Sequence, residues 1–323
     1  MKNNNPKKIL VVRSDRFGEF LLSLYSIKLL KENFPDSEIS ILAQEENIKL
    51  IKGIDFIDKF FNYEKFYENR LGFLKLASFF KKHKFDCIVF LNPKKIFHIA
   101  SFLAGVKTRV GYNRKFGFCL NKTIEDAKDL ARKHETEYNN DLVSLLCDKV
   151  FLPNIQFPAD SIETIAHIEK EGFCKKEKYI IIHPFSSNNK KTWDKQRWFE
   201  LFKDLNKRFN EKIVIIGSLD NKQKFDDIDK EFPNIINLIG ATSLRNLATL
   251  FKHCAKILIT VDSGPMHLAS FFEVPIVSIF GVSSPKRWGP LSSKNVVIYN
   301  NSIEEINISE IVDATAKIIK KAG

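Results

Sequence analysis

Residues 9–19 read ILVVRSDRFGE. The run Ile9–Arg13 is short, largely apolar and rich in β-branched side chains, and the break Ser14–Gly18 follows it directly. Glu19–Asn33 then places apolar side chains at helical spacing, and Pro35 lies just beyond it. An apolar run that gives way at once to a helix is typical of a buried strand in a parallel sheet.

The same alternation continues along the chain and predicts an α/β fold. In the first half we expect strands at 39–42, 87–91 and 106–112, and helices at 73–82 and 127–149. In the second half we expect strands at 179–182, 212–216, 235–238, 257–261 and 275–280, with helices at 194–210, 221–231, 243–253, 265–272 and from 303 onward. Strands that alternate with helices imply βαβ units and parallel sheets.

The length of 323 residues and the two similar halves predict two domains. We place them at residues 1–160 and 161–323, after the chain is punctuated by Pro153 and Pro158. Each is expected to be a doubly wound, Rossmann-like domain, with a cleft between the two. The terminal helix is a candidate to pack back on the N-terminal domain.

Composition indicates a soluble globular protein, with 44% hydrophobic and 28% charged residues. No apolar stretch approaches the roughly 18 residues of a membrane span. The apolar run that begins at Ile9 is soon interrupted by Arg13, Asp15 and Arg16 and does not resemble a signal peptide, so a cytoplasmic location is predicted. The five cysteines are odd in number and contain no C-x-x-C spacing, which favours buried, reduced thiols over disulfides or a zinc site.

The positive charge is concentrated in one segment. The formal net charge is +12, and residues 61–120 hold 12 Lys and Arg residues against 3 Asp and Glu residues. Such a local field favours an anionic partner, namely nucleic acid, a phosphorylated lipid or an acidic glycan. The alternative is a general use of lysine on exposed surfaces.

The strongest local motif is Val261–His267, VDSGPMH. It follows a predicted strand and opens a predicted helix, where free backbone N–H groups favour an anion. Gly264 lets a ligand approach the backbone, and Ser263 can bind a ligand oxygen. The alternative is that Asp262 and Ser263 only cap the helix.

A second motif follows the predicted strand 179–182. His183-Pro184-Phe185-Ser186-Ser187 is followed by Lys190-Lys191-Thr192-Trp193. Serines and then lysines after a strand can hold a phosphate, with lysine as a point charge. The alternative is an ordinary polar loop that covers Trp193.

The third motif is the loop Arg13–Glu19 after the first strand. Glu19 can act as a general base, or it can simply complement the helix dipole. The single glycine, Gly18, argues against a dinucleotide-binding fingerprint.

Asp227 and Asp229 have the spacing of a pair of metal ligands, but they fall within the predicted helix 221–231. Solvated ion pairs are expected there, and no metal site is predicted.

Together these motifs resemble glycosyltransferase family 9, the ADP-heptose:lipopolysaccharide heptosyltransferases. The resemblance spans nearly the whole chain. The matching stretches are Ile9–Glu19, Arg109-Val110-Gly111-Tyr112, Lys191-Thr192-Trp193, Val261–Ala269, Pro275–Gly281 and Pro290. The stretch VDSGPMHLA at 261–269 is the most specific of them.

The resemblance implies a GT-B fold and an inverting, metal-independent transfer without a cofactor. The donor, expected to be ADP-heptose, would bind mainly to the C-terminal domain. Glu19 would be the base, at a position where the family usually has Asp. Lys191 would stabilise the donor diphosphate. The remaining donor residues would be Ser186, Ser187, Asp220, Asp262, Ser263, Gly264 and His267.

The resemblance further implies an anionic, lipid-linked oligosaccharide acceptor on the N-terminal domain, with contact to the inner face of the inner membrane. The acceptor residues would be Arg13, Asp15, Arg16, Gly18 and Arg109. Ser263 replaces the commoner Thr, and Phe185 stands where glycine is common. Another nucleotide sugar, or binding of a nucleotide sugar or anionic glycan without transfer, stays open. The basic segment contains no recognised nucleic-acid module, so no nucleic-acid partner is predicted.

Overall fold

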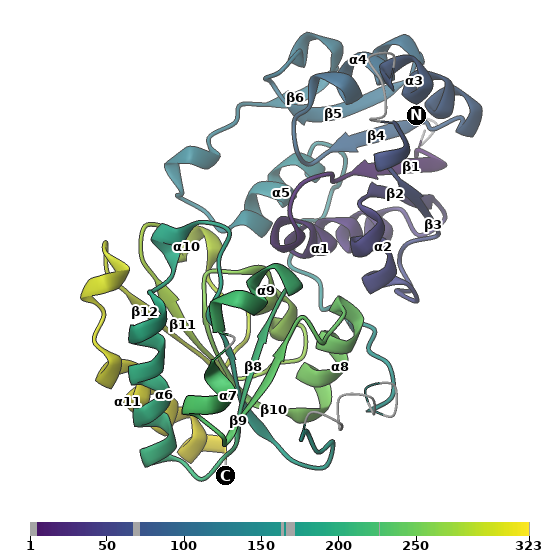
Figure 1. The fold of residues 1–323 in the computed structure, drawn as a ribbon. Coiled ribbons are helices and arrows are strands. Elements are labelled where there is room, and N and C mark those ends of the chain that lie inside the picture. Colours follow the sequence, from purple (N-terminus) through teal and green to yellow (C-terminus); the bar gives the residue numbers. More distant parts are fainter. Residues whose placement is uncertain (1–4, 67–71, 163–164, 166–171, 226, 323) are drawn as a thin grey trace. The chain divides into compact units, whose positions relative to one another are not determined.

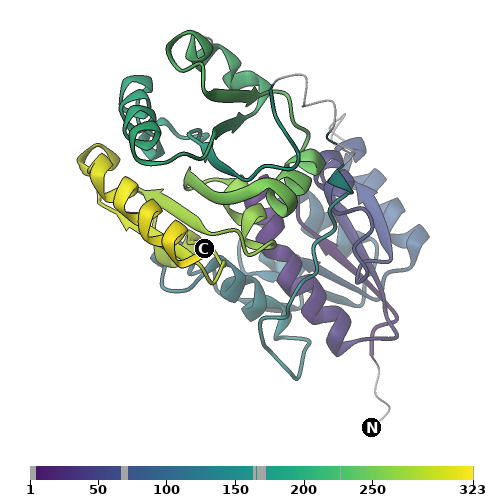
Figure 2. The same cartoon turned by 90° about the horizontal axis from the view of Figure 1, so that it is seen from below.

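The computed structural model describes residues 5–66, 72–162, 165, 172–225 and 227–322. The chain forms two compact units, Met1–Gln156 and Phe157–Gly323. Each contains one six-stranded sheet, and every recorded strand pair is parallel. Figures 1 and 2 show the ribbon from two directions. The boundary lies a few residues before the position 160/161 expected from the sequence.

Unit 1 is a doubly wound α/β domain with the strand order β3-β2-β1-β4-β5-β6. Its elements are β1 (Lys8–Val12), α1 (Phe17–Asn33), β2 (Glu38–Ala43), α2 (Glu45–Ile51), β3 (Lys59–Asn62), α3 (Gly72–His83), β4 (Cys87–Phe90), α4 (Lys95–Leu103), β5 (Thr108–Tyr112), β6 (Lys122–Ile124) and α5 (Glu135–Val143). The strand β1 pairs with β2 on one side and β4 on the other. This central position explains why Ile9–Val12 is apolar at every residue and fully buried.

Unit 2 repeats this arrangement with the order β12-β11-β10-β7-β8-β9. Its elements are β7 (Tyr179–His183), α6 (Lys195–Arg208), β8 (Ile213–Gly217), α7 (Ile228–Glu231), β9 (Ile235–Ile239), α8 (Leu244–Cys254), β10 (Ala255–Val261), α9 (Gly264–Ser270), β11 (Ile276–Phe280), α10 (Pro285–Trp288), β12 (Asn295–Tyr299) and α11 (Ile308–Ala322). The strand β7 is central and buried throughout.

The terminal helix α11 contributes to the core of unit 2. Ile311 and Ala314 are buried in the same apolar cluster as Trp198 and Phe202 of α6. The helix therefore covers its own sheet, next to α6, which differs from the expectation that it packs back on the N-terminal domain.

Two predicted helices are wrong in extent. The expected helix 127–149 is only Glu135–Val143, because Ala131 takes a left-handed φ of +47° and His134 begins a new helix with a capping box to Glu137. The expected helix 221–231 is a 3-10 segment, η6 (Leu219–Phe225), followed by the single turn α7. Asp227 pairs with Lys195 at the surface (2.5 Å), as expected for this motif.

Neither a spanning helix nor a disulfide is found in the described part of the chain. No described helix is both long and apolar enough to cross a membrane. All five cysteines are free thiols, and four of them are buried.

Candidate active site

The strand order of unit 2 creates a switch point between β7 and β10. The chain moves outward from β7 through β8 and β9, and then returns to β10 on the other side of β7. Ligands of such sheets bind beyond the carboxyl ends of the strands at this point. His183, the last residue of β7, is the register partner of Thr260 in β10, so the loops that follow begin side by side.

These two loops are joined by an ion pair between Lys191 and Asp262. The Lys191 Nζ lies 2.7 Å from the Asp262 Oδ2, although the residues are 71 positions apart in sequence. Asp262 is buried, and Lys191 is partly exposed. The structure thus brings together two predicted donor residues and leaves the Lys191 side chain partly exposed.

Hydrogen bonds of Thr192 and Trp193 fix the loop that carries Lys191. The Thr192 hydroxyl donates to the carbonyl of Pro184 and accepts from the Trp198 indole N–H (3.2 Å). The buried Trp193 donates from its own indole to the carbonyl of Ile303 (2.6 Å). Trp193 does pack beneath a polar loop, and that packing anchors the segment that presents Lys191.

Ser263 joins the same edge through its hydroxyl. It occupies the N-cap position of α9, but its side chain makes no capping hydrogen bond. The hydroxyl instead hydrogen-bonds with Nδ1 of His183 (3.1 Å) and with the hydroxyl of Thr260 (3.0 Å). His267, in the first turn of α9, is buried. The alternative that Ser263 only caps the helix therefore does not hold.

The remaining predicted donor residues lie at the carboxyl edge of the same sheet. Ser186 and Ser187 follow β7, and Asp220 lies in η6 just after β8. Ser187 and Asp220 are exposed. The hydroxyl of Ser186 accepts from the backbone N–H of Asn188 (3.4 Å).

In unit 1 the corresponding switch point lies between β1 and β4. Here the backbone N–H of Ser14 donates to Oδ1 of Asn92 (3.1 Å), and the Lys94 ammonium donates to the carbonyl of Ser14 (3.1 Å). Asn92 and Lys94 were not among the site residues predicted from the sequence. Their position directly after the expected strand 87–91 was the available signal.

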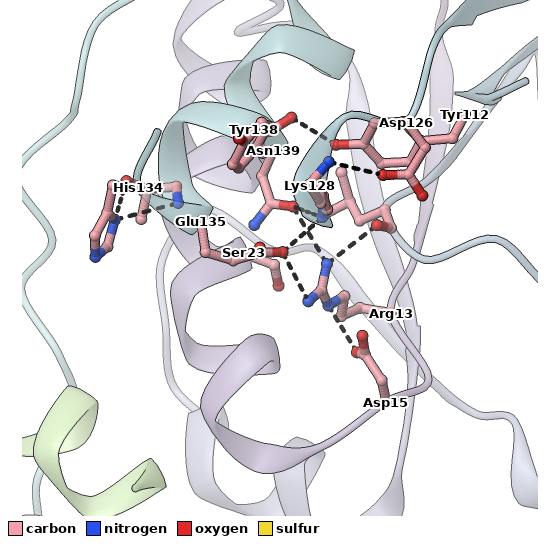
Figure 3. Close-up of polar contacts among 12 residues, drawn as sticks. Arg13, Asp15, Ser23, Tyr112, Asp126, Lys128, His134, Glu135, Tyr138 and Asn139 are labelled. Carbon is pink, nitrogen blue, oxygen red and sulfur yellow. Dashed lines mark hydrogen bonds and ion pairs between the residues drawn. The ribbon is translucent and has the colours of Figure 1, made fainter. Parts of the chain in front are cut away.

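Arg13 lies at the centre of a buried charge network (Figure 3). Only 1% of its side chain is exposed, and its guanidinium lies 2.7 Å from the Asp15 carboxylate and 3.5 Å from that of Glu135. It also donates to Oδ1 of Asn139 (3.2 Å). The ammonium of Lys128 lies 2.6 Å from the same Glu135 carboxylate. Two positive and two negative groups thus compensate one another, as buried charges require.

This network corrects the prediction that Arg13 contacts the acceptor. A guanidinium that is buried against three side chains is not available to a ligand. Arg13 instead fixes Asp15, and with it the loop that leads to α1. Asp15 is partly exposed, Arg16 is exposed, and Gly18 is partly exposed, so these three predicted acceptor residues lie at the surface of unit 1.

Glu19 lies in the first turn of α1 and is half-buried. Burial raises the pKa of its carboxyl group above the ordinary range, and the nearby Asp15 carboxylate raises that pKa further. Arg13 and Arg16 act in the opposite direction. A carboxyl group whose pKa is moved toward neutrality is better matched to general base catalysis than an ordinary surface glutamate.

Arg109 does not join this region. It is the second residue of β5 and therefore lies near the amino end of that strand, at the opposite edge of the sheet from the loop after β1. Its Nε donates to the carbonyl of Cys119 (2.6 Å), and its Nη1 donates to the carbonyl of Val106. The prediction that Arg109 shares an acceptor site with Asp15 and Arg16 is therefore wrong.

No metal cluster is found among the described residues, since nowhere do three His, Cys, Asp or Glu side chains gather closely enough to hold an ion.

The family model of the heptosyltransferases of glycosyltransferase family 9 matches residues 74–317, which is most of the chain. The chain belongs to glycosyltransferase family 9. It is a glycosyltransferase, and the resemblance noted in the sequence is confirmed.

Relatives and solved structures agree with this family. Lipopolysaccharide heptosyltransferase 3 of Escherichia coli is 23% identical over 300 residues, covering 90% of this chain and 88% of the relative. The E. coli ADP-heptose LPS heptosyltransferase II superimposes with a TM-score of 0.82 at 21% identity, covering 98% and 99% of the two chains. E. coli heptosyltransferase WaaC with ADP gives 0.72 at 15% identity, covering 96% and 99%. The predicted GT-B class of two Rossmann-like domains is thereby confirmed.

The match to the family model includes Lys191 and the 262–267 turn, whereas Glu19 precedes the matched range. The interpretation of Glu19 therefore depends on its own surroundings in unit 1. His183, at the carboxyl end of β7, also lies at the switch point of unit 2, although no role of its own was predicted for it. It is buried, and burial lowers its pKa to about 4, so the imidazole is uncharged at neutral pH.

We expect the stability of the protein to fall as the pH drops from 6.5 to about 4, in part because of His183. The unfolded chain takes up this proton near pH 6.5, whereas the folded chain does so only near pH 4, so acid favours unfolding. This difference corresponds to roughly 3 kcal/mol. Urea denaturation at pH 7 and pH 4 measures the loss of unfolding free energy. The His183→Asn variant should lose less of this free energy between pH 7 and pH 4 than the wild type does. An equal loss in both proteins would contradict the assignment.

Proposed function

We propose that this family 9 enzyme transfers heptose from ADP-heptose to a lipopolysaccharide core acceptor, with inversion and without a metal ion. The observation that carries the proposal is the Lys191–Asp262 pair at the switch point of unit 2 (2.7 Å). It supplies a cation and a hydroxyl-binding carboxylate at the edge where α/β sheets bind nucleotides. The relatives named above as lipopolysaccharide heptosyltransferases support the choice of sugar.

On the donor side, the leaving nucleoside diphosphate develops negative charge as the glycosidic bond breaks. The Lys191 ammonium stabilises this charge, and Asp262 holds that ammonium in place before the donor arrives. Asp262 can also accept hydrogen bonds from the sugar hydroxyls. Ser263, Gly264 and His267 provide further contacts in the same turn, and Ser186, Ser187 and Asp220 extend the donor site along the sheet edge.

On the acceptor side, Glu19 removes the proton of the attacking hydroxyl group. The acceptor oxygen forms a bond to the anomeric carbon on the face opposite the diphosphate, and the bond from that carbon to the diphosphate oxygen breaks. The electron pair of the broken bond leaves with the nucleotide, and the proton stays on Glu19. The raised pKa of Glu19 suits this role. Asp15, Arg16 and Gly18 contribute to the acceptor surface.

The proposed acceptor is anionic and lipid-linked, which suits the basic segment at residues 61–120. We place the protein in the cytoplasm, in peripheral contact with the inner face of the inner membrane. The solved relative with bound ADP supports adenine as the donor base.

Thermal-shift measurements with ADP, UDP and GDP, and with their sugar conjugates, test the donor. We expect ADP and ADP-heptose to raise the Tm selectively, since a ligand at 100 times its Kd adds about 3 kcal/mol to stability. Selective stabilisation by UDP or GDP would show that the enzyme uses another nucleotide sugar. Stabilisation by ADP-heptose without release of ADP in the presence of acceptor would support binding without transfer and would overturn the proposal.

A further inference from the structure

Two neighbouring segments of unit 1 expose large apolar side chains. Phe102 and Leu103 end α4 and are 55% and 54% exposed, while Phe116 and Phe118 lie in or next to the 3-10 helix η2 (Gly117–Cys119) and are 39% and 77% exposed. Isolated exposed side chains of this kind are common, but here four lie on two segments that contact each other, and the rings of Phe116 and Phe118 pack together. We call these four residues the α4–η2 surface.

Contacts along α4 hold the two segments together. At the start of the helix, the Lys95 ammonium lies over the ring of Phe116 (5.4 Å). At its end, the Arg109 guanidinium lies over the ring of Phe102 (5.6 Å), while its Nε donates to the carbonyl of Cys119 in η2. These contacts tie the η2 segment to both ends of α4, a helix of about 13 Å.

The backbone before η2 is strained. Lys115 and Phe116 have φ values of +48° and +69°, in the left-handed region that bulky residues rarely adopt. The buried His98 donates from Nδ1 to the carbonyl of Lys115 (3.0 Å) and so holds this turn. Strain of this kind persists where the surrounding structure enforces it, and here its result is that two phenylalanines are displayed in solvent.

The charge around the α4–η2 surface is mostly positive. Residues 87–124 contain seven Lys and Arg residues and no Asp or Glu. Lys95, Lys107 and Lys115 are exposed, and no carboxylate of the described residues lies within ion-pair distance of them. Arg114 pairs with Asp126 (2.6 Å), but most of the local positive charge is uncompensated.

We propose that the α4–η2 surface seats unit 1 on an anionic phospholipid bilayer. Aromatic side chains insert at the boundary between headgroups and acyl chains, while lysine stems extend toward the phosphates. Each lysine near an anionic bilayer adds electrostatic attraction. The apolar and basic groups together therefore bind the bilayer more tightly than either kind of group alone. The inference rests on the proposed function in one respect, because a lipid-linked acceptor gives the enzyme a reason to dock on a membrane.

Vesicle co-sedimentation tests the surface in the absence of donor and acceptor. We expect binding to vesicles of phosphatidylcholine with phosphatidylglycerol, weak binding to phosphatidylcholine alone, and weakening by salt. The double variant Phe102→Ser/Phe118→Ser should bind at least tenfold more weakly. The matched control is Tyr299→Ser, which removes an aromatic side chain of similar exposure (52%) from unit 2 and should bind as the wild type does. Equal binding of the double variant and the wild type would overturn the proposal.

A second measurement reports on insertion itself. The fluorescence of the Phe118→Trp variant should shift to the blue with anionic vesicles and should be quenched by brominated lipid. If the fluorescence did not shift at a lipid concentration that sediments the protein, the proposal would be overturned. It would also be overturned if the Phe102→Ser/Phe118→Ser variant lost binding to an oligonucleotide but kept binding to vesicles. Because neither measurement involves a sugar donor, failure here is distinguishable from failure of the proposed heptosyl transfer.

Discussion

Replacement of Glu19 by Gln is expected to lower kcat by about 10³-fold, within the range found for loss of a general base. The amide has nearly the shape of the carboxyl group but cannot accept the proton of the acceptor hydroxyl. The KM for the donor should change little, because Glu19 is in unit 1 and the proposed donor residues are in unit 2. Steady-state assays of ADP release measure both constants.

Two further variants separate catalysis from a helix-dipole effect. Glu46 also lies in the first turn of a helix, α2, where it is exposed and paired with Lys49. Glu46→Gln should therefore leave kcat unchanged. Asp15→Asn removes a charge that raises the pKa of Glu19, so activity should persist to lower pH than in the wild type. If Glu19→Gln retained full turnover, the proposed base would be wrong.

The order of strands and helices could be predicted in large part because the central strands of each sheet are apolar at every position. Ile9–Val12 and Tyr179–Ile182 are buried, and that burial is visible as an unbroken apolar run. The edge strands β3, β6 and β12 were missed, since their side chains are mostly half-buried or exposed and give no such run. The helix α5 was extended too far, because histidine is an unusual N-cap and its capping box was not anticipated.

The donor side of the site was predictable for a related reason. The carboxyl ends of parallel strands lie at the same edge of a sheet, so the loops that follow two neighbouring strands come close together. Lys191 and Asp262, which follow the neighbouring strands β7 and β10, meet in this way. The roles of the arginines were not predictable. A buried arginine is rare, and the partner that keeps Arg13 inside, Glu135, lies 122 positions away. Arg109 was assigned by motif alone, and only the register of β5 shows which edge it occupies.

Replacement of Lys191 by Ala is expected to lower kcat by about 10³-fold and to weaken ADP binding. Loss of a group that stabilises developing charge on the reacting atoms typically costs 10² to 10³ in rate. The change also leaves the Asp262 carboxylate without its cation at the sheet edge, where it repels a diphosphate. Steady-state kinetics with ADP-heptose and isothermal titration with ADP measure the two effects.

The neighbouring Lys190 provides a control for the general loss of positive charge. It lies in the same short helix η5 (Asn189–Lys191) and is exposed, but the pair with Asp262 is made by Lys191. Lys190→Ala should therefore reduce kcat by no more than a few fold. Lys191→Arg should recover only part of the rate, because a planar guanidinium cannot occupy the position of a compact ammonium held 2.7 Å from Asp262. Equal losses for Lys190→Ala and Lys191→Ala would mean that this loop attracts the donor through its field alone, and Lys191 would lose its assigned role.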